Sequence, residues 1–490
     1  MNCCLELRRF RLVVVQNPDD QDGWQREALR VFHSRLAPAS ALPRPARVPV
    51  VALPLDRLRA ALPPSDRARL DGVEAVAPAL LEGRRVWCVS STARGGGVAE
   101  LLRSFVGYAA GMGVDARWMV LAGDPAFFRF TKRLHDLLHG VANGGLPSAA
   151  DRGAYARVTA ANAHALARLV RPGDVVVLHD PQTAGLVEPL QGCGAVVVWR
   201  CHIGTEQHNA AVAHAWEFLL PLLAPADGFV FTGAWAVPAQ LSGRTVHLIA
   251  PSIDPQAPKN RALAPAAGER LLRPAGLAFA IHPRLVLHLG RWDRLKDPVG
   301  VIDMFERHVL PHADARLVVA GPPVGYVADD PTAVAHYDAV RRRWAALPAP
   351  ARARIQIACL PLRENALIVN ALQRQATVVV KKSLAEGFGL GVTEALWKQR
   401  AVVAAAVGGV RDQIDDGRSG VLVPDPTDLE AFGASVVELL GEPLRRAALG
   451  AAGRERVGAR YLHDRHMADW TTLLAELLQP AGATAAVGGG

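Results

Sequence analysis

Two acidic residues flank a glycine-rich turn late in the chain and suggest a binding site. Glu386 lies in the turn, and Glu394 lies two turns along the helix that the following residues predict. Between them, Gly387, Phe388 and Gly389 offer backbone N–H groups at the positive end of this helix, where a phosphate or a developing oxyanion is stabilised. Carboxylates accept hydrogen bonds from hydroxyls, and N–H groups donate to phosphates. A nucleotide sugar presents both groups.

Two simpler arrangements could also produce this acidic pair. An ordinary strand-to-helix turn with a solvated glutamate on the helix has the same spacing. A dinucleotide-binding turn fits poorly, because the third glycine position holds Val392 when counted from Gly387 and Glu394 when counted from Gly389. A dehydrogenase would also need an acidic residue about 20 positions after its glycine fingerprint, and we find none.

A second glycine-rich turn lies in the first half of the chain. Residues 86–92 are typical of a strand, 93–97 of a turn and 98–106 of a helix with one apolar face. Gly96 and Gly97 would let a ligand approach the backbone and meet N–H donors at the helix start. A plain tight turn is the alternative, and the sequence does not decide between the two.

Strands and helices alternate along the chain, and the alternation starts again in the second half. Apolar, β-branched segments predict strands at 48–53, 86–92, 117–121, 175–180, 195–202, 228–232, 245–249, 285–290, 317–321, 355–360, 377–380, 402–405 and 421–424. Helical patterns lie between several of these strands, which indicates parallel, doubly wound sheets. The proline-rich segment 250–258 is typical of a hinge. We therefore expect an α/β protein in which two Rossmann-like domains face each other across a cleft.

These patterns divide the chain into five parts. We expect a variable N-terminal extension, two Rossmann-like domains, a C-terminal helix and a disordered tail, at 1–45, 46–252, 253–455, 456–478 and 479–490. Residues 55–81 predict one or two helices, with Pro63 and Pro64 between them.

Composition excludes several classes of protein. Half of the 490 residues are apolar, yet no run approaches the roughly 18 to 20 apolar residues of a membrane span. The first residues carry charges where a signal peptide needs an apolar segment, so we expect a cytoplasmic enzyme. The net charge of +9 suits anionic ligands, but no dense Lys/Arg block interleaved with aromatic residues indicates a nucleic-acid partner. The oligomeric state is open, with a homodimer among the alternatives.

Metal and disulfide chemistry is not expected. Six cysteines are scattered through the chain, which is typical of reduced, structural cysteines. The acidic pairs 329–330 and 415–416 lie in predicted loops, where solvated or helix-capping roles are expected. We predict no metal site and no cofactor.

A pair of cationic side chains completes a resemblance to a known family of enzymes. Arg291 and Lys296 lie five residues apart directly after a predicted strand. Together with Glu386 and Glu394, they resemble the retaining GT-B glycosyltransferases of family GT4, over roughly residues 48–478. The resemblance implies transfer of a glycosyl group from a nucleotide sugar to an acceptor hydroxyl, without a metal. It assigns acceptor binding to the first domain and the nucleotide sugar to the second.

Segments of the first domain narrow the resemblance. They look like the trehalose glycosyltransferring synthases and the trehalose phosphorylases, at residues 90–100, 116–120, 128–135, 178–182, 199–203 and 250–260. Those enzymes form the α,α-1,1 link between two glucoses. The synthase uses a nucleoside diphosphate glucose and free glucose, and the phosphorylase works reversibly with phosphate.

The resemblance also assigns roles to individual residues. It implies that Arg291 and Lys296 bind the donor diphosphate, that Glu386 contacts the donor sugar and that Glu394 contacts the ribose. His202 ends a strand and matches a histidine that contacts the donor sugar. The predicted catalytic residues are Arg291, Lys296, Glu386 and His202. The further predicted donor-binding residues are Gly96, Gly97, Gly387, Phe388, Gly389 and Glu394.

Acceptor binding is assigned to residues of the first domain. The candidates are His179, Asp180, Gln182 and Arg200, and structural, hinge or turn roles are the alternative for the first three. Two acceptor-side segments, 204–209 and 231–238, depart from the family pattern. A related enzyme with another sugar or acceptor, a trehalose phosphorylase, and a catalytically silent sugar-nucleotide-binding protein are therefore alternatives.

Overall fold

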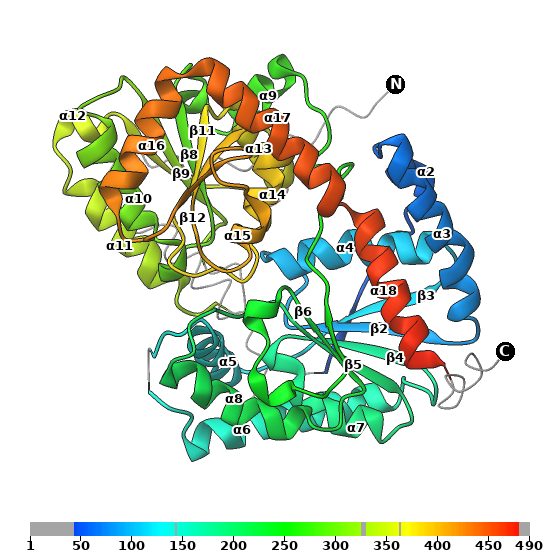
Figure 1. Ribbon diagram of the computed structural model, residues 1–490. Helices are drawn as coiled ribbons and strands as arrows, with labels where there is room; N and C mark the ends of the chain where they lie inside the picture. The colour runs from blue at the N-terminus through cyan, green and yellow to red at the C-terminus, as the bar shows by residue number, and fades with distance from the viewer. Residues whose placement is uncertain (1–43, 143–144, 325–329, 362–363, 480–490) are drawn as a thin grey trace, which may run out of the picture.

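Two sheets, one in each half of the chain, form the frame of the protein (Figure 1). The structure is a computed structural model that describes residues 44–142, 145–324, 330–361 and 364–479. Most of the predicted N-terminal extension at 1–45 and of the predicted tail at 479–490 lies outside the described residues.

The first sheet has the strand order β1-β3-β2-β4-β5-β6-β7. β1 pairs antiparallel with β3, and the strands from β3 to β7 pair in parallel. The strands are β1 (Ala46–Val48), β2 (Arg85–Ser90), β3 (Asp115–Val120), β4 (Val175–His179), β5 (Val196–Cys201), β6 (Gly228–Phe231) and β7 (Val246–Leu248).

The second sheet is parallel, with the order β10-β9-β8-β11-β12-β13. Its strands are β8 (Leu285–Leu289), β9 (Arg316–Gly321), β10 (Ile355–Cys359), β11 (Val378–Lys381), β12 (Ala401–Ala405) and β13 (Val421–Val423). The prediction of two doubly wound, Rossmann-like domains is confirmed.

Helices cover both faces of each sheet, because strands buried on two sides must place apolar side chains against both layers. One face of the first sheet packs against α5 (Pro125–Leu138), α6 (Ala149–Ala167), α7 (Val187–Gln191) and α8 (Ala210–Leu223), and the other against α4 (Gly97–Gly111) and α18 (His463–Leu478). The second sheet packs against α9 (Pro265–Leu272), α13 (Asn365–Gln375) and α14 (Leu390–Trp397) on one face, and against α10 (Pro298–Met304), α11 (Ala333–Ala345) and α16 (Leu429–Gly441) on the other.

The predicted strand at 48–53 is wrong beyond its first residue. β1 ends at Val48, and the segment that follows is irregular. Pro49 and Pro54 lack the N–H group that a sheet ladder needs. The expected break between two helices is confirmed, since α2 (Leu55–Arg59) and α3 (Pro64–Leu80) are separate.

The C-terminal helices join the two domains. α17 (Pro443–Arg460) runs without a break through the boundary drawn at 455, and the chain turns at Tyr461 and Leu462 before α18 begins. In Figure 1, the red α18 lies beside α3 in the N-terminal half of the chain. The C-terminal segment therefore completes the core of the first domain.

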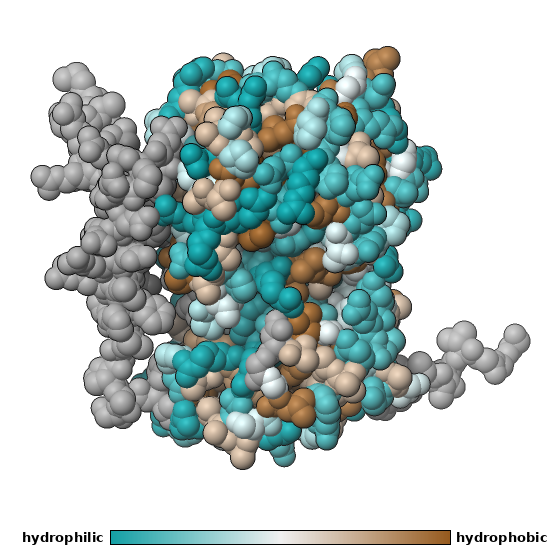
Figure 2. Space-filling view, turned by 90° about the vertical axis from the view of Figure 1, so that its left-hand side faces the viewer, coloured by the Kyte–Doolittle hydropathy of each residue, from teal (hydrophilic) through white to brown (hydrophobic). Residues whose placement is uncertain are grey.

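The surface shown in Figure 2 is mostly hydrophilic, with hydrophobic side chains in small groups between polar ones. Among the described residues, no helix is long and apolar enough to cross a membrane.

We expect Trp470→Ala in α18 to lower the free energy of unfolding by about 3 to 5 kcal/mol, because it leaves a cavity in a packed core. Trp470 is 5% exposed, and its cluster includes Trp118 and Val177 of the first sheet. Urea unfolding followed by circular dichroism measures the change. Leu444→Ala, at a position that is 84% exposed, is the control and should change little. Equal loss in both variants would contradict this docking of α18.

Candidate functional site

A cavity of about 350 Å³ lies between the two domains. It is lined where parallel strands end: Ser90 ends β2, His179 ends β4, and His202 follows β5, while Leu289 and Lys381 end β8 and β11 of the second domain. The carboxyl ends of parallel strands are the usual place for a ligand in such sheets, because the connecting loops leave a crevice there. The predicted cleft between the domains is thus confirmed.

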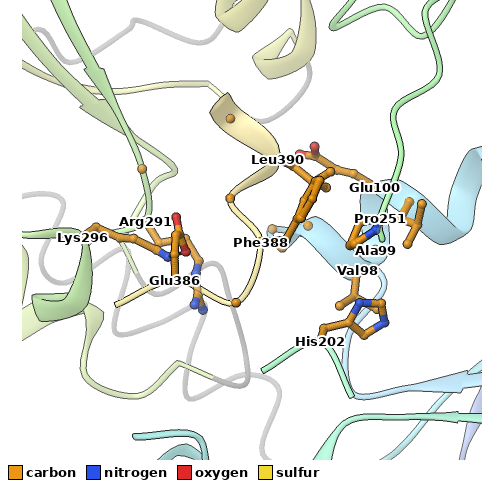
Figure 3. A pocket seen from close by; sticks show the side chains of 18 of the residues that line it. Val98, Ala99, Glu100, His202, Pro251, Arg291, Lys296, Glu386, Phe388 and Leu390 are labelled. Carbon is orange, nitrogen blue, oxygen red and sulfur yellow. Dashed lines mark hydrogen bonds and ion pairs between the residues drawn. The ribbon is translucent and has the colours of Figure 1, made fainter. Parts of the chain in front are cut away.

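Lys296 and Glu386 form an ion pair in this cavity. Glu386 is buried, and Lys296 comes from η5 (Arg294–Lys296) after β8. Burial by itself would raise the pKa of Glu386, but the charges of Lys296 and Lys381 outweigh it and hold this pKa below its usual value. At neutral pH, Glu386 is therefore an ionised acceptor for a ligand hydroxyl. Figure 3 shows both side chains beside Arg291 on one side of the pocket.

Lys381 adds a second buried cation that the sequence had not singled out as a site residue. Its Nζ donates to the carbonyl oxygen of Leu289 at 2.5 Å, and burial lowers its pKa to about 8. Because this value is near neutrality, the positive charge beside Glu386 can respond to a bound anion. Its position at the end of β11, facing the cavity, was the signal that could have identified it.

Arg291 is held by two carboxylates of its own domain. Its guanidinium lies 3.6 Å from Asp293 and 3.5 Å from Asp330. Of the two roles expected for Asp330, the solvated one is wrong, because this residue is 4% exposed. Its carboxylate also accepts a hydrogen bond from the hydroxyl of Thr332 at 3.0 Å, just before α11. Residue 329 lies outside the described residues.

The turn between Glu386 and α14 brings the two domains together. A Cβ on Gly387 would lie 2.0 Å from the carbonyl oxygen of His202, so only glycine fits this contact. Gly389 has a φ of +86°, in the left-handed region that favours glycine. The ring of Phe388 packs edge-on against the ring of Tyr461, with the two ring centroids 5.5 Å apart. The predicted glycines are thus required by geometry, and the turn lines the cavity.

Glu394 lies one turn into α14 and is 3% exposed. The Nζ of Lys259 lies 3.1 Å from a carboxylate oxygen of Glu394 and 2.7 Å from a carboxylate oxygen of Glu100 in α4. A carboxylate from each domain thus meets one lysine from the connecting segment. Neither Lys259 nor Glu100 was predicted as a site residue, because their sequence neighbourhoods gave no indication of the partner.

The histidines of the first domain form a pair. His179 Nδ1 and His202 Nε2 lie 3.0 Å apart. The two imidazole rings are stacked, with their centroids 5.3 Å apart. Burial lowers the pKa of His179 to about 3 and the pKa of His202 well below its usual value, so both rings are neutral at pH 7. Asp180 accepts a hydrogen bond from the backbone N–H of His202 at 2.7 Å, which fixes the loop.

Three of the four predicted acceptor residues line the cavity, and Arg200 does not. Arg200 is 1% exposed within β5 and donates to the carbonyl oxygen of Phe231 at 3.2 Å. Arg200 lies within β5, whereas the cavity is lined by His202 and Ile203, which follow the end of this strand. The assignment of Arg200 to acceptor binding is therefore not supported.

The turn before α4 also lines the cavity, which favours the ligand-binding interpretation of Gly96 and Gly97. A Cβ on Gly97 would lie 3.1 Å from Leu390 Cδ1 at the start of α14. The starts of α4 and α14 thus face each other across the domain junction, as Figure 3 shows through Val98, Ala99 and Leu390.

Two further histidines line the cavity without having been predicted. His135 and His139 lie on α5 and at its C-terminal end, with ring centroids 4.7 Å apart. Their spacing of four residues puts them on one helix face, a pattern that could have been recognised. Burial lowers the pKa of both rings, so they offer neutral hydrogen-bonding groups. In the described part of the chain, no three His, Cys, Asp or Glu residues form a metal-binding group.

Comparison with known families agrees with this geometry. Residues 88–237 match the family described as "Trehalose synthase, N-terminal domain", and residues 276–456 match "Glycosyl transferases group 1". The two matched segments contain the residues that line the cavity, except Pro251 and Lys259 of the connecting segment.

Similar proteins cover most of the chain. It is 36% identical over 400 residues to the trehalose synthase of Rubrobacter xylanophilus, across 81% of this chain and 92% of that protein. It is 31% identical over 401 residues to the trehalose synthase of Pyrococcus horikoshii, across 81% and 91%.

A solved structure shares the fold. The trehalose-phosphate synthase of Burkholderia xenovorans in complex with glucose-6-phosphate superposes with a TM-score of 0.67 at 18% identity, over 81% of this chain and 100% of that one. The GT-B fold predicted from the sequence is confirmed. The chain belongs to the trehalose synthase family of group 1 glycosyltransferases.

Proposed function

We propose that this protein is a retaining glycosyltransferase that moves glucose from a nucleotide sugar to free glucose and so forms trehalose. The observation that carries the proposal is the cavity in which Arg291, Lys296, Glu386 and Glu394 of one domain face His202 of the other. The named relatives support trehalose as the product.

Arg291 and Lys296 would stabilise the leaving diphosphate. A guanidinium can donate to two phosphate oxygens at once, and an ammonium adds a compact positive charge. Both side chains line the cavity near the N–H groups of the turn before α14. Charge that builds up on the departing diphosphate would therefore meet groups already in place.

Glu386 would hold a hydroxyl of the donor sugar, and Glu394 a hydroxyl of the ribose. In the free protein each carboxylate is paired with a lysine. A bound donor would bring phosphates for Lys296 and hydroxyls for Glu386, so each member of that pair gains a new partner. The ion pair thus keeps the buried charge of Glu386 compensated until the donor binds.

The acceptor would enter beside His202 and Gln182. Its hydroxyl oxygen would bond to the anomeric carbon on the face that the diphosphate leaves. The bond from that carbon to the diphosphate oxygen breaks, and the hydroxyl proton passes to the diphosphate. Neutral histidines suit this role, because they can orient a sugar hydroxyl without adding charge near the reacting carbon.

The segments that depart from the family pattern do not line the cavity. Glu206 pairs with Arg411 at 2.9 Å, and the indole N–H of Trp235 donates to Asp412 at 3.0 Å. Both contacts join the first domain to α15 (Val410–Gln413) of the second. These segments therefore contribute to the domain junction and not to the cavity walls, which supports glucose as the acceptor.

We expect Lys296→Gln to lower the turnover number by at least about 10²- to 10³-fold, because it removes charge stabilisation of the leaving group. Released nucleoside diphosphate measures turnover, and circular dichroism checks the fold. Arg67→Gln removes a positive charge from an exposed position of α3 and serves as the control. Turnover of Lys296→Gln equal to that of the control would refute the assigned role.

We expect EDTA to leave the transfer rate unchanged, because Arg291 and Lys296 already supply positive charge to the diphosphate. The rate is measured after dialysis against EDTA, and again after Mg²⁺ is returned. Strict dependence on a divalent ion would contradict the proposed use of side-chain cations.

The acceptor is tested with a panel of nucleoside diphosphate sugars, each with and without free glucose. We expect α,α-trehalose and nucleoside diphosphate from a glucose donor, identified by mass spectrometry and by the anomeric signals in proton NMR. Donor binding without a disaccharide would preserve the fold assignment and direct the search to another acceptor. Trehalose cleavage that requires phosphate would instead identify a phosphorylase.

A further inference from the structure

A second cavity, of about 380 Å³, opens between the domains on the other side of α5. Its walls come from α5 in the first domain and from η5 and the start of α11 in the second. No residue assigned above to donor or acceptor binding lines it.

The two cavities share their dividing wall. α5 turns His135 and His139 toward the first cavity, and Lys132 and Asp136 toward the second. Lys132 of α5 connects this wall to the second domain, since its Nζ lies 3.1 Å from a carboxylate oxygen of Asp293. The same Nζ lies 2.9 Å from a carboxylate oxygen of Asp136. A buried ion pair between the domains thus separates the two spaces.

The second cavity is lined by more basic side chains than acidic ones. Its three carboxylates all have a basic partner: Asp136 and Asp293 contact Lys132, and Asp151 pairs with Arg133. Two exposed arginines remain, Arg129 from α5 and Arg294 from η5. Neither has an ion-pair partner within the described ranges.

We propose that this second cavity binds a phosphate-bearing small molecule between Arg129 and Arg294. Two guanidinium groups present forked donors that match the several oxygens of a phosphate. One arginine comes from each domain, so a bound phosphate would also tie the domains together in the arrangement that assembles the first cavity. The proposal does not depend on the identity of the donor or acceptor.

A ligand there would act close to the donor site. Asp293 faces the second cavity and lies 3.6 Å from Arg291, which faces the first. A negative charge beside Lys132 and Arg294 would therefore be felt by the cation assigned to the donor diphosphate, because interactions between partly buried charges are weakly screened.

Equilibrium dialysis with radiolabelled inorganic phosphate tests the proposal, at constant ionic strength set with sodium chloride. Phosphate also suits the donor site, so binding is measured in a Lys296→Gln background. There we expect phosphate binding to persist. The added pair Arg129→Gln and Arg294→Gln should weaken it by at least about tenfold, because two charge-assisted contacts are lost.

Arg67→Gln with Arg418→Gln, in the same background, removes the same charge from exposed positions elsewhere and should leave binding unchanged. Thermal unfolding without phosphate checks that each variant folds. Equal phosphate affinity with and without Arg129 and Arg294 would overturn the proposal. So would the absence of phosphate binding in the Lys296→Gln background, or an equal loss in the control pair.

Discussion

The two domains touch backbone to backbone where the carbonyl of His202 faces Gly387, and the site depends on this contact. A Cβ at Gly387 would lie 2.0 Å from that oxygen. The absence of a side chain lets the turn that carries Glu386 reach the histidine pair of the first domain. The charged side chains of Lys296 and Glu386 and the imidazoles of His179 and His202 then share one cavity. A wider contact would leave two half-sites too far apart to position both substrates.

Charge compensation is the second constraint on this junction. Buried carboxylates are costly unless paired, and the protein pairs each of them with a lysine from another element: Glu386 with Lys296, and Glu394 with Lys259. In the proposed function the pairs also prepare the site, because a nucleotide sugar carries phosphates for the cations and hydroxyls for the anions. The proposal thus makes the same side chains serve both the stability of the protein and the recognition of the donor.

The junction is built from more than the catalytic cavity. Lys132 crosses the cleft to Asp293 on one side, while Glu206 and Trp235 cross it to Arg411 and Asp412 on another. The last two contacts use the segments that depart from the family pattern. The junction therefore depends on side chains outside the walls of the first cavity. The second cavity lies along the same junction.

The repeated strand–turn–helix units can be predicted from the amino-acid sequence, because hydrophobic periodicity and glycine-rich turns are local properties. The sequence also identified Arg291, Lys296, Glu386 and Glu394 by residue type and position after strands. Which side chains contact one another became known from the folded structure. It added Lys381 to the cavity, placed Arg200 outside the cavity lining and showed Asp330 to be buried, and it brought Lys259 to Glu100 across 159 positions. Such contacts depend on the order of the strands in each sheet and on the face of the sheet to which each side chain points, and local sequence patterns do not encode either.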